Sequence, residues 1–150
     1  MPDLDPFDRS ILRELAADGR LSNQSLAAKV GLSPSATLRR VQRLEATGAI
    51  RGYRAVLGPE ATGVGFTAYI AVGLNDHTKH GQEAFERAVA RSDEVRECHN
   101  ITGTVEYLLR IEARDLADYK RFHTDVLGVL PQVARLTTYV VMGSPKDERG

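Results

Sequence analysis

The sequence predicts an α+β protein in which a helical N-terminal third precedes a longer region of strands and helices. Two observations support this fold class. Apolar residues recur at helical spacing in three short segments before residue 48, and each segment begins at a residue suited to capping a helix. From residue 66 onward, segments of alternating apolar and polar residues are separated by helical patterns in the order βαββαβ. With 42% hydrophobic residues in 150, the chain can form packed cores.

The first region contains three predicted helices joined by short turns. Asp5 caps the first helix, Ser22 the second and Ser33 the third, and only Gly31 and Leu32 lie between the second helix and the third cap. Two helices joined by so tight a turn form a helix-turn-helix, whose second helix enters the major groove of DNA. The side chains expected to face the core of this region are those of Phe7, Ile11, Leu12, Leu15, Leu26, Ala27, Val30, Thr37, Val41 and Leu44.

Positive charge is concentrated on the third helix, although the formal net charge of the whole chain is zero. Residues 1–54 carry a net charge of +3 and residues 55–150 a net charge of −3. Arginine is the commonest reader of guanine and also binds phosphate, so we predict that Arg39, Arg40 and Arg43 contact DNA. Pairing of Arg40 with Glu45 or with another acid of this region is the alternative. The predicted outer face of the helix consists of Ser35, Ala36, Arg39, Arg40, Gln42 and Arg43.

Other polar residues near the two helix starts complete the predicted DNA contacts. Arg20, Asn23 and Gln24 surround the start of the second helix and suit the phosphate backbone, although simple exposure to solvent is an equal alternative for each. The remaining predicted contacts, on the third helix and its cap, are Ser33, Ser35 and Ala36.

The alternation of residues 50–57 predicts a short strand, which would make the helix-turn-helix a winged one. Glycines and a proline follow, so a hinge is expected there. The predicted organisation is therefore a DNA-binding domain at 1–53, a strand and hinge at 54–65, a second domain at 66–143 and a polar tail at 144–150.

The second domain is predicted to be ferredoxin-like, a four-stranded antiparallel sheet with both helices on one face. Strands are expected at 66–74, 95–101, 106–112 and 133–142, with helices at 81–91 and from Asp115. The helix residues expected to be buried are Ala84, Phe85, Ala88, Val89, Leu116, Tyr119, Phe122 and Val126. The other face of the sheet, with Tyr69, Ala71 and Gly73 on its first strand, is too apolar for solvent, so a second subunit is expected to cover it.

Several classes of protein are not expected. No apolar run approaches the ~20 residues that span a bilayer, and the chain opens with acidic residues, so we expect no membrane anchor, no signal peptide and a cytoplasmic location. Cys98 has no partner for an internal disulfide. No catalytic triad, phosphate loop or metal-ligand spacing is apparent, so we predict neither an enzyme nor a cofactor or metal site.

Both halves of the sequence resemble the Lrp/AsnC, or feast/famine, transcriptional regulators. The N-terminal signature is carried by Leu4-Asp5, Asp8, Ile11-Leu12, Asp18-Gly19-Arg20, Gly31-Leu32-Ser33-Pro34, Arg40-Val41, Leu44-Glu45, Gly48 and Ile50. The C-terminal resemblance is carried by Glu97-Cys98-His99, Thr102-Gly103, Tyr107-Leu108-Leu109 and Thr138-Tyr139-Val140-Val141-Met142. The resemblance covers residues 4–143 and implies a dimer that associates further, commonly to an octamer, with DNA wrapped around it and an amino acid as effector.

The resemblance also implies an effector pocket between subunits, lined by the loop after the second strand and by the last strand. The residues that it implies are His99, Thr102, Gly103, Thr104, Glu106, Thr137, Thr138 and Tyr139. Thr104 stands where the family often has an acid, and Leu136 where a threonine is common. A leucine cannot hydrogen-bond a ligand carboxylate, so the effector stays open, and a plain turn at Gly103 to Glu106 is the alternative interpretation. Two other functions also stay open: an enzyme resembling sirohaem decarboxylases, which share this two-domain fold, and an architectural protein that wraps DNA with little sequence preference.

Overall fold

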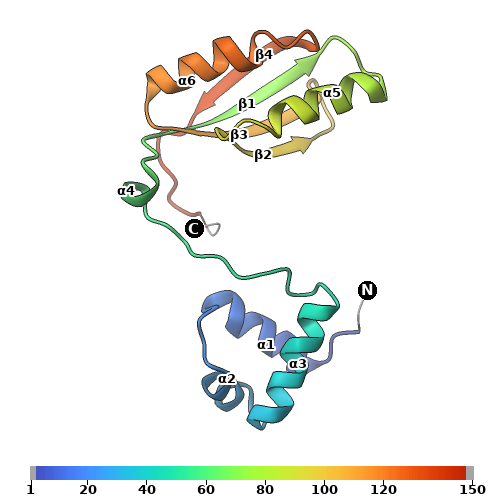
Figure 1. Ribbon diagram of the computed structural model, residues 1–150, viewed down its shortest axis with the longest axis vertical. Coiled ribbons are helices and arrows are strands. Elements are labelled where there is room, and N and C mark those ends of the chain that lie inside the picture. Colours follow the sequence, from blue (N-terminus) through green and yellow to red (C-terminus); the bar gives the residue numbers. More distant parts are fainter. Residues whose placement is uncertain (1–2, 148–150) are drawn as a thin grey trace. The chain divides into compact units, whose positions relative to one another are not determined.

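The computed structural model describes residues 3–147, which divide into two compact units with the boundary between Ala55 and Val56. The N-terminal unit consists of the helices α1 (Pro6–Ala17), α2 (Asn23–Val30) and α3 (Pro34–Ala46), coloured blue to cyan in Figure 1. Within the described part of the chain, no helix has the length and apolar character needed to cross a membrane.

Each of these helices begins at its predicted cap. The side chains of Asp5, Ser22 and Ser33 each accept a hydrogen bond from the backbone N–H three residues later, which satisfies one of the unpaired donors at the helix start. Gly31 ends α2 in the left-handed region, with φ of 72°, where a residue without Cβ is favoured. The turn between α2 and α3 is therefore as short as the sequence predicted.

The core of the N-terminal unit is small. Its buried apolar cluster consists of Ile11, Leu26, Val30 and Leu44, with Leu12, Leu15 and Val41 partly buried around it, and Ala27 is buried as well. The prediction for Phe7 was wrong, because this ring is 42% exposed. It supports the guanidinium of Arg40, whose carbon lies 5.4 Å from the ring centroid, so a charged partner replaces the core contact.

The strand predicted at residues 50–57 is absent from the described structure. Tyr53, Val56 and Leu57 are instead exposed, at 53%, 69% and 59%. A strand needs hydrogen bonds from a neighbouring strand, and within residues 3–147 none pairs with this segment. The predicted wing is therefore not formed by the described chain, and the predicted hinge region contains a one-turn helix, α4 (Pro59–Thr62).

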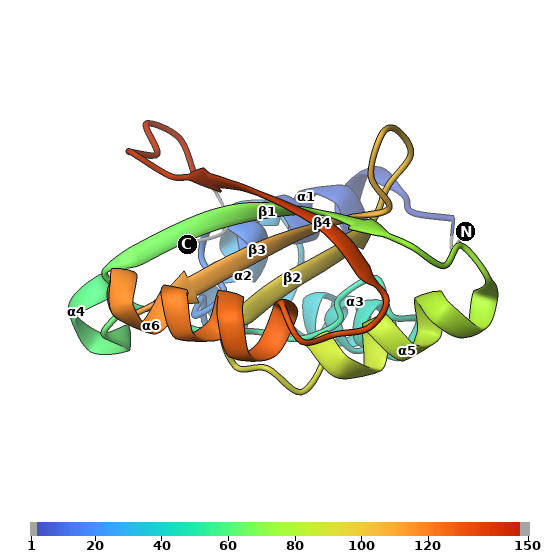
Figure 2. The same cartoon turned by 90° about the horizontal axis from the view of Figure 1, so that it is seen from above.

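The C-terminal unit has the predicted ferredoxin-like topology. Its sheet has the order β2-β3-β1-β4 with every pair antiparallel. Figure 2 shows α5 and α6 on the same side of this sheet. The elements in chain order are β1 (Phe66–Leu74), α5 (Lys79–Val89), β2 (Val95–Asn100), β3 (Tyr107–Ala113), α6 (Leu116–Phe122), a π-helical turn η1 (His123–Leu127) and β4 (Val133–Val140).

The main core lies between the sheet and these helices. It consists of Ile70, Val72, Leu74, Phe85, Val89, Tyr107, Leu109, Ile111, Phe122 and Leu127. Phe85 and Phe122 are buried as predicted, whereas Ala84 and Ala88 are only partly buried. The prediction for Leu116 was wrong, because this first residue of α6 is exposed and the buried stripe begins one turn later, at Tyr119.

On the opposite face of the sheet, the described residues of the C-terminal unit form no helix. The register places Tyr69 of β1 between Arg110 of β3 and Tyr139 of β4, and Ala71 between Leu108 and Thr137, all on this open face. Apolar and aromatic groups therefore lie along β1 and β4. Charged groups gather on β2 and β3, where the Arg110 side chain contacts Glu112 at 2.6 Å.

Candidate nucleic-acid interface and effector region

The turn of the helix-turn-helix is held by a hydrogen bond between its two helices. Asn23 Nδ2 donates to the carbonyl of Pro34 at 2.7 Å, and this bond joins the first residue of α2 to the first residue of α3. The backbone N–H of Leu32 donates to the carbonyl of Ala27 at 3.1 Å within the turn. One N–H of the Asn23 amide therefore holds α3 in place, and the predicted contact of Asn23 with DNA phosphate stays a prediction.

One face of α3 is open to solvent. Ser35, Arg39, Gln42 and Arg43 are exposed there, and Ala36 and Arg40 are half-buried. Within residues 3–147 the Arg39 guanidinium has no hydrogen bond or ion pair, so its donors are available to an outside partner. Arg39 is therefore the cation of this face best placed to bind a nucleic acid.

Arg40 and Arg43 are bound to the start of α1. Asp5 and Asp8 form a capping box, in which the side chain of each accepts the backbone N–H of the other. Arg40 Nη1 donates to Asp5 Oδ2 at 2.7 Å and to Asp8 Oδ1 at 2.8 Å, and Arg43 Nη2 donates to Asp8 Oδ2. We call these four residues the α1–α3 charge cluster. The Asp8 side chain at its centre is fully buried.

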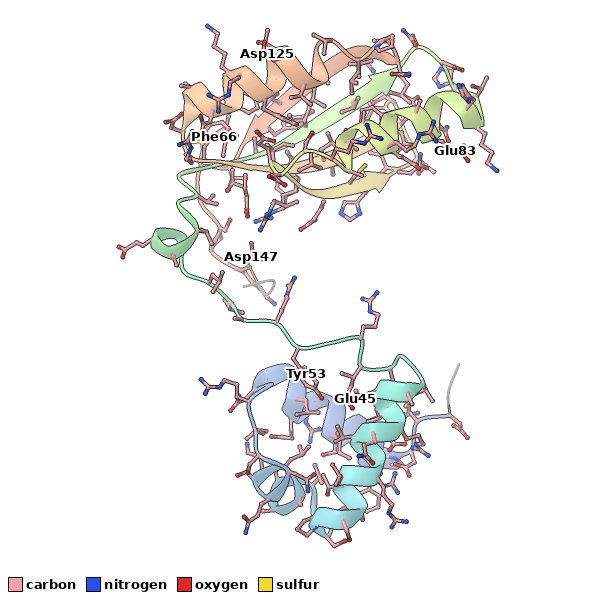
Figure 3. All side chains as sticks on the ribbon, in the orientation of Figure 1. Glu45, Tyr53, Phe66, Glu83, Asp125 and Asp147 are labelled. Carbon is pink, nitrogen blue, oxygen red and sulfur yellow. The ribbon has the colours of Figure 1, made fainter. Side chains whose placement is uncertain are left out.

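This charge cluster shifts the pKa of two of its members, Asp5 and Arg40. The pKa of Asp5 is lowered, chiefly because the Asp8 N–H binds the ionised carboxylate and secondly because Arg40 does. The pKa of Arg40 is raised by its bonds to Asp5 and Asp8. The alternative partner considered for Arg40, Glu45, instead accepts from the hydroxyl of Tyr53 at 2.9 Å; both are labelled in Figure 3.

The remaining predicted DNA residues lie around the starts of α2 and α3. Arg20 and Gln24 are exposed. Ser33 uses its hydroxyl to accept the N–H of Ala36 at 3.2 Å, and the same hydroxyl lies 3.3 Å from that of Ser35. The sequence did not reveal Asp8 as a partner of the third helix, although the Asp-x-x-Asp spacing at positions 5 and 8 was a readable capping-box signal.

In the C-terminal unit, the predicted effector loop joins β2 to β3. Gly103 has φ of 136°, a conformation that a side chain disfavours, and Thr102 and Thr104 are exposed beside it. Arg135 of β4 donates from Nη2 to the carbonyl of Thr104 at 2.8 Å. One arginine therefore joins the loop to the start of the last strand within this chain, and the effector pocket between subunits stays a prediction.

Glu106 ends this loop and holds the end of β1. Its Oε2 accepts the backbone N–H of Leu74 at 2.7 Å, and its Oε1 lies 3.3 Å from Nδ1 of His77. The register of β1 against β4 shifts between Gly73 and Leu74, so the glutamate binds a backbone donor at this irregularity. The sequence carried no signal for this contact, because the partners are about thirty residues apart.

The other predicted effector residues do not form one site in this chain. His99 of β2 and Thr137 of β4 lie on the same face but at opposite edges of the sheet, about 14 Å apart for three strand spacings. Tyr139 shares the open face with Thr137. Thr138 lies on the covered face, where its hydroxyl is hydrogen-bonded to that of Tyr119. Thr138 is therefore part of the packing between β4 and α6.

A separate cavity of about 420 Å³ lies beside β2 and α5. Tyr107 donates to Glu86 Oε1 at 2.7 Å on its wall, and burial raises the pKa of Tyr107 to about 12. Burial also raises the pKa of the Cys98 thiol to about 11. Both groups are neutral at pH 7, so the cavity presents neither a thiolate nor a phenolate. Among the described residues, no group of three His, Cys, Asp or Glu side chains could hold a metal ion.

Comparison with known proteins agrees with both halves of the molecule. Residues 4–45 match the AsnC-type helix-turn-helix domain, and residues 67–150 match the Lrp/AsnC ligand binding domain. The leucine-responsive regulatory proteins of Escherichia coli K12 and Salmonella typhimurium are each 41% identical to the chain over 145 residues, covering 97% of this chain and 88% of the relative.

Solved structures give the same result. A transcriptional regulator from Neisseria meningitidis, determined as a complex with L-Met, is 35% identical with a TM-score of 0.92, covering 97% of this chain and 94% of that one. An AsnC family regulator from Agrobacterium tumefaciens is 31% identical with a TM-score of 0.89, covering 95% and 93%. The present chain belongs to the Lrp/AsnC family of transcriptional regulators.

Proposed function

We propose that this family member recognises specific DNA sequences through α3, and that an amino acid bound to its C-terminal domain changes its DNA affinity or its oligomeric state. The observation that carries the DNA part is the exposed α3 face, on which Arg39 has no partner within the described residues and projects from a tightly held helix-turn-helix. A helix held in this way presents its outer side chains to the base edges of a major groove.

The predicted DNA residues divide into two roles. Arg39 acts as the base reader, because a free guanidinium can donate two parallel hydrogen bonds to guanine. Arg20, Gln24, Ser35 and Arg43 contact phosphates, which fix the position of the protein on DNA but carry no sequence information. Ser33, Ala36 and Asn23 lie at the helix starts and allow the backbone there to approach the DNA.

A dimer is part of this proposal. The open face of the sheet carries Ala71 and Leu108 in one row, with Tyr69 beside Tyr139 in the next. The same face of a second subunit can cover this apolar surface, because a two-fold axis brings the same patch of both subunits together. Two-fold symmetry would also place two α3 helices in successive major grooves, about 34 Å apart. Higher assembly, such as the octamer that the family resemblance implies, would build on this dimer.

The effector is proposed to bind where Arg135 joins the β2–β3 loop to β4. Exposed hydroxyls of Thr102, Thr104 and Thr137 supply donors and acceptors there, and Glu106 supplies a carboxylate. These groups suit the ammonium and carboxylate of a free amino acid. The Neisseria relative was solved with L-Met, which supports an amino acid as the ligand class. His99 would reach such a ligand only from another subunit, because it lies at the far edge of its own sheet.

The DNA proposal is tested by selection from a random duplex pool with the full-length protein. We expect enrichment of one motif, bound at least about a thousandfold more tightly than random DNA. Log affinity should fall steeply with log salt concentration, because phosphate neutralisation releases counterions. Strong binding without an enriched motif would indicate the architectural alternative, and no binding at low salt would reject the proposal.

The effector proposal is tested by a thermal-shift screen with the twenty amino acids. A ligand that binds only the native state raises the midpoint, by RT ln(1 + [L]/Kd) in free energy. We expect one or a few amino acids to do so and to change the affinity for the selected DNA. If none of the twenty amino acids shifts the midpoint, the amino-acid assignment is contradicted and the DNA proposal remains intact.

A further inference from the structure

The guanidinium of Arg40 is directed at α1 and not at solvent. Nη1 donates to both Asp5 and Asp8, so both hydrogens of that nitrogen are used within the N-terminal unit. The ring of Phe7 lies under the guanidinium. The Arg40 side chain is 27% exposed, compared with 53% for Arg43. An end-on contact of the Nη1 and Nη2 fork with a base would require Arg40 to give up at least one of these two charge-assisted hydrogen bonds.

Asp8 makes this arrangement strongly preferred. Its side chain is fully buried, and a buried carboxylate is unfavourable unless cations and hydrogen-bond donors surround it. Its donors are the backbone N–H of Asp5 and the side chains of Arg40 and Arg43. Because 32 residues separate Asp8 from Arg40, the pair fixes the start of α1 against the middle of α3.

We propose that Arg40 is a positioning residue, which sets the orientation of α3 through Asp5 and Asp8 so that Arg39 meets the bases. This inference rests on the proposed DNA-binding function and assigns a different role to each of two adjacent arginines. Arg39 contacts DNA, and Arg40 acts on DNA only through the placement of α3.

Positioning predicts an effect mainly on specific binding. Hydrogen bonds to base edges weaken steeply with misalignment, whereas the attraction of the protein to phosphate depends less on the exact angle of one helix. Loosening the α1–α3 charge cluster should therefore reduce affinity for the selected sequence more than affinity for random DNA. A merely structural role would lower the melting temperature and leave the ratio of these affinities unchanged wherever the protein is folded.

The two possible roles of Arg40 give opposite results for Asp8→Asn. If Arg40 itself contacted DNA, Asp8 would compete with DNA for it, and the substitution would free Arg40, remove a negative charge and strengthen binding. If Arg40 is a positioning residue, Asp8→Asn weakens specific binding by about the same factor as Arg40→Ala. The double variant should then lose less affinity than the sum of the two single losses, because both changes break the Arg40–Asp8 interaction.

The experiment measures the affinity of full-length variants for the wild-type-selected duplex and for random duplex, below each variant's melting midpoint. We expect Arg40→Ala and Asp8→Asn each to lower specific affinity at least about tenfold, the equivalent of losing one base contact, with an unchanged salt slope. Arg39→Ala is the matched control and should add its loss to either variant. The milder Asp5→Asn variant, at a partly exposed position, keeps the test available if Asp8→Asn does not fold.

Two results would overturn the proposal. One is a rise in the ratio of specific to random-DNA affinity in Asp8→Asn, and the other is a salt slope reduced by about 1 in Arg40→Ala, the signature of a lost phosphate contact. Amide hydrogen exchange gives a readout without DNA, since Arg40→Ala should speed exchange in the first turn of α1 and along α3. If the wild type selects no DNA, the proposed function fails, and normal exchange rates in Arg40→Ala would reject the positioning role separately.

Discussion

The two units of this protein are stabilised in different ways. The core cluster of the C-terminal unit contains ten buried side chains between a sheet and two helices, including Phe85, Tyr107 and Phe122. The core cluster of the N-terminal unit contains four, and its helices are fixed by side-chain caps and by the carboxylate of Asp8. A small unit buries a smaller fraction of its surface, so polar contacts supply a larger share of its stability. The same polar groups adjoin the α3 face proposed to bind DNA, so we expect stability and recognition to be linked in that unit.

The largest expected effect concerns the open face of the C-terminal unit. Ala71→Glu places a charge between Leu108 and Thr137, where we expect a second subunit to pack. We expect dissociation to monomers of 16.5 kDa, and a fall of DNA affinity by about a hundredfold or more as the second half-site contact is lost. Light scattering and a far-UV spectrum measure assembly and folding. Ala117→Glu, at an exposed position of α6, is the matched control; an unchanged mass for Ala71→Glu would contradict the dimer.

The next effect compares equivalent core deletions in the two units. Leu44→Ala and Leu109→Ala remove fully buried side chains, and each should cost about 2 to 5 kcal/mol. A unit of 55 residues has about 3 to 8 kcal/mol in total, so Leu44→Ala should remove a large part of the stability of the N-terminal unit and raise its unfolded population. Leu109→Ala should leave its larger unit folded at 25 °C. Amide hydrogen exchange resolved by segment measures the stability of each unit. If each variant loses the same amount of protection in its own unit, the two units do not differ in their tolerance of a core deletion.

DNA contacts should show an intermediate effect. Arg39→Ala should cost about 1 to 3 kcal/mol of discrimination at one base position without changing stability, because its side chain has no partner within the described chain. Arg43→Ala should weaken binding to all sequences and also lower stability, since it removes one donor from Asp8. Binding assays paired with denaturation curves separate these effects. Wild-type affinity in both variants would reject α3 as the recognition helix.

A smaller effect is expected at Thr37, a buried polar side chain of the N-terminal unit. Within the described residues its Oγ1 has no hydrogen-bond partner. Thr37→Val keeps the shape of the side chain and removes the desolvated hydroxyl, so we expect a gain of about 1 kcal/mol in the free energy of unfolding. Urea denaturation tests this, with Thr37→Ala as a cavity-forming control that should be destabilising. A loss of stability in Thr37→Val would show that the hydroxyl is satisfied in solution.

The smallest effect concerns acid. The pKa of Asp5 is lower in the folded protein than in the unfolded chain, so its contribution is complete above its ordinary pKa and is lost as pH falls through the lowered value. The N-terminal unit should therefore weaken below about pH 4. Asp5→Asn should make the stability of the N-terminal unit less dependent on pH. The pH dependence of the C-terminal unit, where Arg114 lowers the pKa of Asp118, should not change. Amide exchange rates measured at pH 5 and pH 3 compare the two units. If the stability of the N-terminal unit depends on pH in Asp5→Asn as it does in the wild type, the contribution assigned to Asp5 is contradicted.

Local features of this protein could be predicted from its sequence, because the interactions that produce them lie within a few residues. Asp5, Ser22 and Ser33 cap helices by accepting the backbone N–H three residues later. Gly31 adopts a left-handed backbone conformation that a side chain would disfavour. The alternation along β1 likewise placed Ala71 on the uncovered face, since side-chain direction in a strand follows from the pleat.

Contacts between distant residues were decided only by the tertiary structure. Phe7 is spaced along α1 like the core residues, yet its ring contacts Arg40 instead. The reason is that the Arg40 guanidinium of α3 hydrogen-bonds Asp8 beside this ring. Residues 50–57 have the pattern of a strand, but a strand forms only where another offers its hydrogen bonds. Thr138 and His99 were both expected in the effector pocket. In the sheet, with the order β2-β3-β1-β4, they lie on opposite faces and at opposite edges. A pattern specifies the direction of a side chain along its own element, and packing determines which partner that side chain meets.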